Sequence, residues 1–337
     1  MIRVLVSQKG TALSELRWHP LLEQWVITAT DRQERTFFPP DDYCPLCPTK
    51  ENGFPTEIPC ADFDLVTFEN KFPSLKRCPP EPAVEGTDLY RIRPAEGVCA
   101  VILYSPEHIG TLTDKSEEEI EKLVHVWTDR YIELGALDFV DYVFIFENKG
   151  KEIGVTLSHP HGQIYAYPFM PPIIEKELAS SRKHKEKTGR CLLCDILAEE
   201  LRDGRRLVVS NEHFVAFIPF YARYPYEVHI LPREHRLCLT DFSDAEKESL
   251  ASVLKKVLLK YDNLWGMSIP YMMVLHQKPT DGGSHDHYHF HIEFYPPYRT
   301  KEKLKYLAGS EAGAGVFIND TLAEEKAKEL REAEPRT

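Results

Sequence analysis

The residues best suited to chemistry in this chain form the segment His159-Pro160-His161-Gly162-Gln163. It leads directly into the apolar run Ile164-Tyr165-Ala166-Tyr167, which is typical of a strand. In an extended chain, side chains two positions apart point to the same side. We therefore expect His159, His161 and Gln163 to line one face. This arrangement suits a histidine that attacks a phosphorus centre while a neighbouring amide hydrogen-bonds the transferred group.

A strand and a loop of small side chains precede this segment. The strand-like run is Phe144-Ile145-Phe146, and it continues into Glu147-Asn148-Lys149-Gly150 and then Gly154-Val155-Thr156. Backbone N–H groups in such a loop can approach phosphate oxygens closely. The loop and the histidine segment together predict a phosphate-binding site beside His161.

The combination F-E-N-K-G, a following glycine and H-P-H-G-Q resembles the active-site signature of galactose-1-phosphate uridylyltransferases, members of the histidine-triad superfamily. Further matches extend from about residue 17 to about residue 331, so the resemblance covers nearly the whole chain. It implies a histidine-triad architecture and an enzyme that transfers a nucleotidyl group between sugar phosphates.

The composition sets limits on the class of protein. A chain of 337 residues with 42% apolar residues can form two domains or one duplicated domain with a sizeable core. The 53 acidic residues outnumber the 41 basic ones, which gives a net charge of −12 and no basic run, so we expect no nucleic-acid partner. We also expect no membrane partner, because no apolar run is long enough to cross a bilayer. The N-terminal stretch is unlike a signal peptide, which favours the cytoplasm.

The chain contains an internal duplication. The ten residues Glu107–Ser116 agree with Glu234–Ser243 at six positions, at a spacing of 127 residues (235 − 108). The pair His159/His161 recurs as His289/His291, at a spacing of 130 (289 − 159). A C-x-x-C pair and an apolar strand-like run precede the first of these motifs in both halves. The order of features therefore predicts two equivalent halves.

The matched segments also predict a long helix in each half. Ser116-x-x-Glu119 and Ser243-x-x-Glu246 are capping boxes, and each precedes an amphipathic pattern. Short strands followed by one long helix favour an α+β fold of two tandem histidine-triad-like repeats, with mainly antiparallel strands joined in a shared sheet flanked by helices. We expect a catalytic half at residues 1–179, a junction at 180–190 and a second half at 191–337.

Four of the eight cysteines form two C-x-x-C pairs, which favour metal over disulfides in a chain of this kind. Structural zinc takes four ligands, and the repeated histidines can complete each set. The predicted first zinc site is Cys44, Cys47, His108 and His159, and the second is Cys191, Cys194, His235 and His289. Some uridylyltransferases hold a second metal through one glutamate and three histidines. The matching positions here are Glu177, His276, His291 and Glu293, so an iron-type site is an alternative in which one histidine has become glutamate.

The resemblance assigns roles to individual residues. His161 would carry the nucleotidyl group, its N–H held by the backbone of His159, and Gln163 would hydrogen-bond a phosphoryl oxygen. The second half has His291 followed by Glu293, whose charge would repel a phosphate, so we expect one active centre per chain. The residues that match substrate-contacting positions are Arg32, Arg35, Asn70, Asn148, Gly154, Thr156, Lys305, Tyr306 and Glu311.

The expected activity is that of a UDP-glucose–hexose-1-phosphate uridylyltransferase acting on UDP-hexose and hexose 1-phosphate. In the family the segment at 305–311 reaches a neighbouring subunit's site, which implies a homodimer. Lys71 stands where an aspartate is common and Ser310 stands where a tyrosine is usual. The alternatives are an ADP-glucose/phosphate adenylyltransferase of the same superfamily, a phosphodiesterase-like hydrolase, and a zinc-stabilised nucleotide-binding protein without turnover.

Overall fold

The computed structural model describes residues 13–34, 43–50, 53 and 55–334. Its strands are β1 (Ser14–His19), β2 (Gln24–Ala29), β3 (Val66–Glu69), β4 (Ile92–Pro94), β5 (Val98–Leu103), β6 (Tyr142–Lys149), β7 (His161–Tyr167), β8 (Leu207–Ser210), β9 (Phe214–Phe217), β10 (Val228–Pro232), β11 (Tyr271–His276), β12 (His291–Tyr295), β13 (Tyr298–Thr300) and β14 (Lys303–Leu304). Its α-helices are α1 (Glu117–Gly135), α2 (Pro172–Thr188), α3 (Leu192–Asp203), α4 (Asp244–Trp265) and α5 (Ala323–Glu332).

One large antiparallel sheet runs through both halves. Its order is β3-β5-β7-β6-β11-β12-β10-β9-β8. The order β5-β7-β6 of the first half is mirrored by β10-β12-β11 of the second, and the halves join where β6 pairs with β11. This shared sheet of two repeats confirms the predicted α+β architecture.

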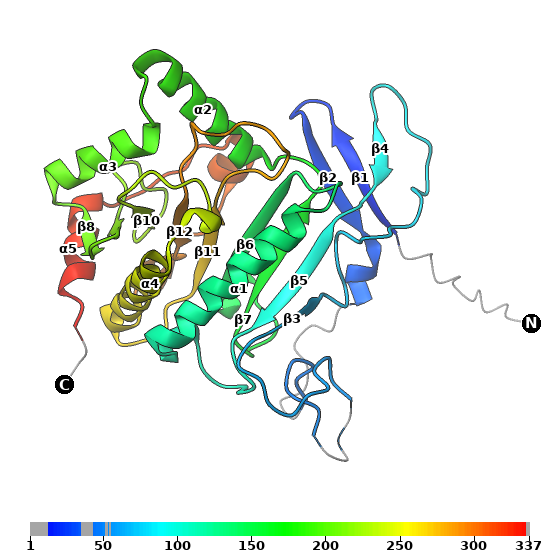
Figure 1. The fold of residues 1–337 in the computed structure, drawn as a ribbon, viewed down its shortest axis with the longest axis horizontal. Helices are drawn as coiled ribbons and strands as arrows, with labels where there is room; N and C mark the ends of the chain where they lie inside the picture. The colour runs from blue at the N-terminus through cyan, green and yellow to red at the C-terminus, as the bar shows by residue number, and fades with distance from the viewer. Residues whose placement is uncertain (1–12, 35–42, 51–52, 54, 335–337) are drawn as a thin grey trace, which may run out of the picture.

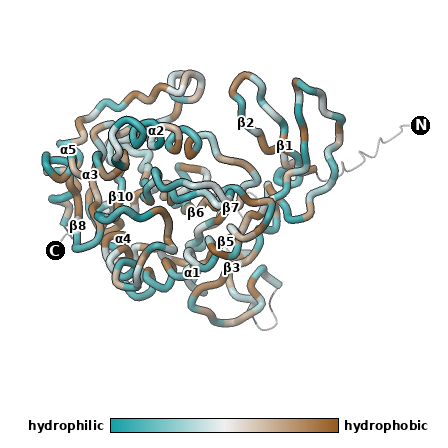
Figure 2. The backbone as a smooth tube through the Cα atoms, turned by 45° about the horizontal axis from the view of Figure 1, so that its top comes forward, coloured by the Kyte–Doolittle hydropathy of each residue, from teal (hydrophilic) through white to brown (hydrophobic). Residues whose placement is uncertain are grey.

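The long helices of the two repeats cover one face of the sheet. In Figure 1, α1 and α4 lie side by side in front of the strands, and both begin at the predicted capping boxes. In each box the serine side chain accepts the backbone N–H of the glutamate, and the glutamate side chain accepts the serine N–H. Apolar stripes of both helices belong to one buried cluster with the strands, in which α1 packs against β6 and α4 packs against β8 and β9, so most of the hydrophobic core lies in this layer. Figure 2 shows the matching alternation of hydrophobic and hydrophilic residues around the helices.

The opposite face of the sheet is covered by other elements. Helix α2 packs Ile174 and Leu178 against Tyr142, and α3 packs against β9. A small sheet of order β2-β1-β4 packs Leu16 against Cys99 of β5. These additions leave part of β7 uncovered on this face, and the histidine segment lies there.

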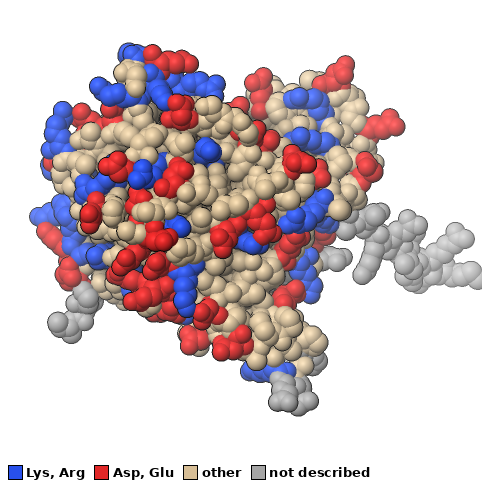
Figure 3. Space-filling view, viewed as in Figure 1, with Lys and Arg blue, Asp and Glu red and all other residues tan. Residues whose placement is uncertain are grey.

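The expected junction at 180–190 falls within α2 and the turn that follows it. The polar residues of that stretch are therefore helical, and the division of the chain at 179 and 191 stays a prediction. Among the described residues, none of the helices combines the length and the hydrophobicity that a membrane crossing needs. On the face drawn in Figure 3, lysine and arginine side chains lie in small groups between acidic ones.

Candidate functional site

His161 is the first residue of β7, and its ring is held by the chain that precedes it. Nδ1 lies 2.8 Å from the backbone oxygen of His159. Because a carbonyl only accepts, Nδ1 must carry the proton, and the neutral ring then has its lone pair on Nε2. Along β7 the alternation of burial places His161 and Gln163 on the half-exposed face and Gly162 on the buried face. His159 lies in a bend before the strand, so the alternation rule applies to His161 and Gln163 only.

Two cavities meet at His161. The larger has a volume of about 490 Å³ and is lined by Asn148 near the end of β6 and by the loop that follows, including Gly150 and Thr156. The smaller, about 160 Å³, is lined by Asn70 and by Gln163. A site with two compartments that share one histidine suits a substrate with a phosphate group between two larger parts.

The loop after β6 has the backbone shape expected of a phosphate cradle. Gly150 and Gly154 both have positive φ, at 105° and 86°, which an L side chain rarely adopts. A Cβ on Gly150 would also meet the ring of Pro270 at 2.6 Å. Glycine is therefore required here, and the loop can bring backbone N–H groups close to an anion.

The first predicted zinc set is assembled at the end of the larger cavity. Cys44, Cys47, His108 and His159 place their donor atoms within 4.8 Å of one another. Cys47 Sγ lies 3.4 Å from His108 Nδ1 and 3.6 Å from His159 Nδ1. With ordinary Zn–S and Zn–N bonds, the sulfur–nitrogen edge of a tetrahedral site is about 3.6 Å. The four residues therefore fit zinc, and the outer nitrogen of His159 donates to the backbone oxygen of Ser105 at 2.9 Å.

The second predicted zinc set has the same geometry. Cys191, Cys194, His235 and His289 again gather within 4.8 Å. The sulfur–nitrogen distances are 3.7 Å for Cys191 to His289, 3.4 Å for Cys194 to His289 and 3.5 Å for Cys194 to His235. The two sets differ in one respect. The outer nitrogen of the fully buried His289 has no acceptor among the described residues.

Protonation of these ligands follows from burial and from their neighbours. Burial raises the pKa of Cys47 to about 11 and lowers the pKa of His159. The hydrogen bond with Cys194 lowers the pKa of Cys191 to about 3. Zinc deprotonates a coordinated thiol outright, so both pairs would bind it as thiolates.

The alternative metal set combines Glu177 with three residues of the second half, where His291 is held like His161, with Nδ1 3.0 Å from the backbone oxygen of His289. Glu177, His276, His291 and Glu293 are brought together by α2, β11 and β12. Two carboxylates and two imidazoles suit a harder divalent cation than the Cys–His sets do. Burial disfavours a charged His291, but its hydrogen bond to Glu293 and the charge of Glu177 outweigh this and raise its pKa to about 9.

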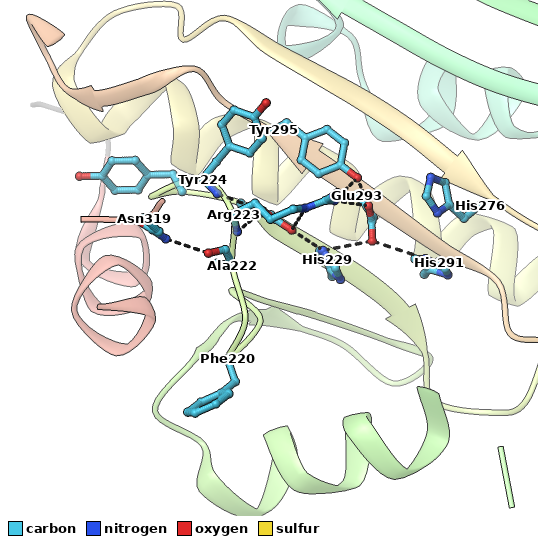
Figure 4. A network of polar contacts seen from close by, with 12 residues as sticks. Phe220, Ala222, Arg223, Tyr224, His229, His276, His291, Glu293, Tyr295 and Asn319 are labelled. Carbon is cyan, nitrogen blue, oxygen red and sulfur yellow. Dashed lines mark hydrogen bonds and ion pairs between the residues drawn. The ribbon is translucent and has the colours of Figure 1, made fainter. Parts of the chain in front are cut away.

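Glu293 is also held by polar side chains of the protein itself, as Figure 4 shows. Arg223 donates to its Oε2 at 3.1 Å, where the Tyr295 hydroxyl also donates. His229 Nε2 lies 3.2 Å from its Oε1. Glu293 thus already has partners in the protein. A metal ion would therefore bind less tightly here than at a site whose carboxylates have no such partners.

The N-terminal substrate positions lie beside the smaller cavity. Asn70 accepts the backbone N–H of Phe72 through Oδ1 at 2.9 Å, and Arg32 donates to the backbone oxygen of Phe72 at 3.3 Å. Lys71, which departs from the family pattern, forms an ion pair with Glu57 at 3.1 Å. Arg35 lies outside the described residues.

The C-terminal substrate positions do not line either of the two cavities that meet at His161. Lys305 is 4% exposed, and its Nζ lies 3.1 Å from Glu311 Oε1, while Tyr306 is 72% exposed. The cavity linings contain none of the three. Lys305 and Glu311 hold the segment in shape, and their role as substrate contacts stays a prediction.

Sequence reasoning missed several buried or half-buried polar residues around these sites. Arg223 and His229 surround Glu293, and Tyr104 and Tyr271 both donate to Glu147. A usable signal was present in the 221–229 stretch, where charged residues lie among aromatic ones just before and at the start of an apolar strand.

Comparison with known proteins agrees with this geometry. The N-terminal domain of galactose-1-phosphate uridyl transferase matches residues 6–171, and its C-terminal domain matches residues 177–335. The galactose-1-phosphate uridylyltransferase of Thermotoga maritima is 45% identical over 323 residues, which is 96% of this chain and 99% of that protein.

Solved structures show the same relationship. A uridylyltransferase superposes with a TM-score of 0.83 at 37% identity, covering 95% of this chain and 98% of the other. An ADP-glucose phosphorylase from Arabidopsis thaliana reaches 0.71 at 25% identity, covering 95% and 99%. Because both domains of one family match along nearly the whole chain, and a relative of that family is 45% identical from end to end, this chain belongs to the galactose-1-phosphate uridylyltransferase family.

Proposed function

We propose that the protein exchanges a uridylyl group between glucose 1-phosphate and galactose 1-phosphate through a covalent intermediate on His161. The observation that carries the proposal is the 2.8 Å contact from His161 Nδ1 to the His159 backbone oxygen. It selects the tautomer in which Nε2 is the nucleophile, at the point where two cavities meet.

The chemistry balances without an additional acid. Nε2 of His161 attacks the α-phosphorus of UDP-glucose, and the bond from that phosphorus to the bridging oxygen breaks. Glucose 1-phosphate leaves with the electron pair. Its phosphate has a pKa of about 6, so it departs without a proton donor. Galactose 1-phosphate then attacks the same phosphorus, and the phosphorus–nitrogen bond breaks to regenerate neutral His161.

Other residues would bind and orient the substrate. The Tyr165 hydroxyl lies 3.5 Å from Gln163 Oε1, which leaves the amide NH₂ as a donor toward a phosphoryl oxygen. Asn148, Gly154 and Thr156 would contact the phosphates. Arg32 and Asn70 lie by the smaller cavity, where we place the nucleoside, and we propose that Arg35 joins them.

We propose zinc at both Cys–His sets, with a structural role. A zinc ion held partly by His159 would fix the carbonyl that orients His161, and it would take no part in bond making. At the set containing Glu177 and Glu293 we propose a weaker site for a harder cation such as iron.

We also propose a cytoplasmic homodimer. All eight cysteines are free, which suits a reducing compartment. The C-terminal segment exposes Tyr306, Leu307, Val316 and Ile318, which supports contact with a second subunit through which Lys305, Tyr306 and Glu311 would read the hexose.

The test is intact mass after brief mixing with UDP-glucose alone, quenched at alkaline pH. We expect a gain of one uridylyl group that is absent in His161→Ala and discharged by galactose 1-phosphate. The matched variant His291→Ala, at the equivalent position of the second half, should still be labelled.

Other outcomes would change the conclusion. Labelling by ADP-glucose but not by UDP-glucose would indicate adenylyl transfer. Loss of the label to water at the same rate with and without galactose 1-phosphate would indicate a hydrolase. If neither donor labels the protein, the covalent mechanism is wrong.

A further inference from the structure

A buried hydrogen-bonded network lies behind the catalytic strand. Glu147 of β6 is 4% exposed, and both of its oxygens accept tyrosine hydroxyl groups. Tyr104, which follows β5, donates to Oε2 at 2.8 Å, and Tyr271 of β11 donates to Oε1 at 2.9 Å. The network therefore connects three strands and joins the two halves of the chain. None of the proposed zinc ligands or substrate contacts belongs to it, although Glu147 also lines the larger cavity.

Tyr104 contacts the residues on both sides of His161. Its backbone N–H donates to the oxygen of Pro160 at 3.4 Å. On the other side, a Cβ built on Gly162 would lie 2.5 Å from the Tyr104 hydroxyl oxygen, so only glycine allows the hydroxyl to pack there. Pro160 and Gly162 are thus both held against Tyr104, while the His161 ring projects from the opposite face of β7.

A buried carboxylate at position 147 lowers the stability of the fold relative to an apolar side chain. Burial raises its pKa, although the hydrogen bonds from the two tyrosines oppose that shift. A buried carboxylate adds less to stability than an apolar side chain of similar size would. Stability alone therefore does not explain why a carboxylate lies in this core.

The second half offers an internal comparison. Gln163 pairs with Phe146 across β7 and β6, and Glu293 pairs with Val274 across β12 and β11. By this register Leu275 takes the place of Glu147, and Ile292 takes the place of Gly162. The half that lacks the catalytic glutamine thus has an ordinary apolar core where the first half has the network.

We infer that Tyr104, Glu147 and Tyr271 are positioning residues that hold the Pro160–Gly162 backbone and thereby orient His161 for attack on phosphorus. The inference rests on the proposed function. The network acts through backbone position, so it should affect the rate of the covalent step more than substrate affinity or zinc binding.

The experiment measures the rate of His161 labelling at several concentrations of UDP-glucose. We expect Tyr104→Phe to lower the maximal rate about tenfold, with the half-saturating concentration and the zinc content unchanged. Gly162→Ala should lower the rate at least about a hundredfold, because the new Cβ displaces the backbone that carries His161.

The double variant Tyr104→Phe/Gly162→Ala gives the sharpest result. Without the hydroxyl, the nearest atoms to the new Cβ lie at 3.4 Å, so its rate should recover to that of Tyr104→Phe alone. The matched control is Tyr261→Phe, which removes a buried hydroxyl that donates to the Tyr226 backbone oxygen at 2.8 Å. This control should lower the melting temperature without changing the labelling rate.

The outcomes distinguish the positioning role of the network from the proposed uridylyl transfer. If the wild-type protein is labelled but Tyr104→Phe labels at the wild-type rate, or the double variant stays as slow as Gly162→Ala, the inference is wrong and the proposed function stands. If the wild-type protein is not labelled by any donor, the proposed function fails and the inference fails with it.

Discussion

Zinc should leave the second Cys–His set before the first when a chelator is added. In the first set both histidines have an outer hydrogen bond, from His159 to the Ser105 backbone oxygen at 2.9 Å and between His108 and Ser158 Oγ at 3.1 Å. In the second set the outer nitrogen of His289 has no acceptor among the described residues. Loss of one such partner weakens metal binding about 10- to 100-fold. This corresponds to about 1.4–2.7 kcal/mol.

The assay uses the wild-type protein at increasing chelator concentrations. Native mass spectrometry counts the zinc ions, and alkylation mapped by peptide mass shows which cysteines become reactive. We expect Cys191 and Cys194 to react at a chelator concentration at least about tenfold below that needed for Cys44 and Cys47.

A control variant tests the stated cause. Ser158→Ala removes the outer partner of His108, but that histidine is exposed and water can replace the hydroxyl. Zinc binding at the first set should therefore stay within about threefold. His289 is fully buried, and the same replacement is not open to it. Simultaneous release from both sets, or earlier release from the first, would refute the reasoning.

Three further predictions concern individual side chains. Gln163→Glu recreates the charge found in the second half and should slow uridylyl transfer about 10²- to 10³-fold in single-turnover assays, and an unchanged rate would exclude a phosphoryl contact. Arg223→Met should destabilise the fold by about 3–5 kcal/mol in urea unfolding because it removes the arginine that contacts Glu293, and adding Glu293→Gln should restore most of the loss. An unchanged free energy of unfolding in Arg223→Met would contradict this reasoning. Hydrogen bonds from backbone N–H groups and from Lys305 lower the pKa of Glu311 to about 2, so its stabilising contribution is complete above the unfolded value of 4.5 and is lost as the pH falls towards 2. The difference in unfolding free energy between the wild type and Glu311→Gln should thus be constant above pH 5 and smaller at pH 3, and a gap that does not narrow would contradict the assigned pKa.

Local features of the sequence were sufficient to predict the two long helices and the strand that carries His161. Ser116 and Ser243 begin the two long helices because capping boxes and amphipathic spacing act between residues a few positions apart. The alternation along β7 likewise placed His161 and Gln163 on one face. The repeated order of cysteines and histidines predicted two four-residue sets, and the fold brings both together.

Tertiary structure decided which groups each side chain contacts. Lys305 and Glu311 pair with each other because the chain turns back at 309–313, and their contact with a substrate stays a prediction. The sequence singled out Glu147 only as a member of the F-E-N-K-G motif and did not indicate its partners. Its tyrosine partners are 43 and 124 residues away, and they meet it only because β5 and β11 lie near β6 in one sheet. Sequence spacing determines periodicity and caps, whereas the partners of a buried charge depend on strand order and register across the whole fold.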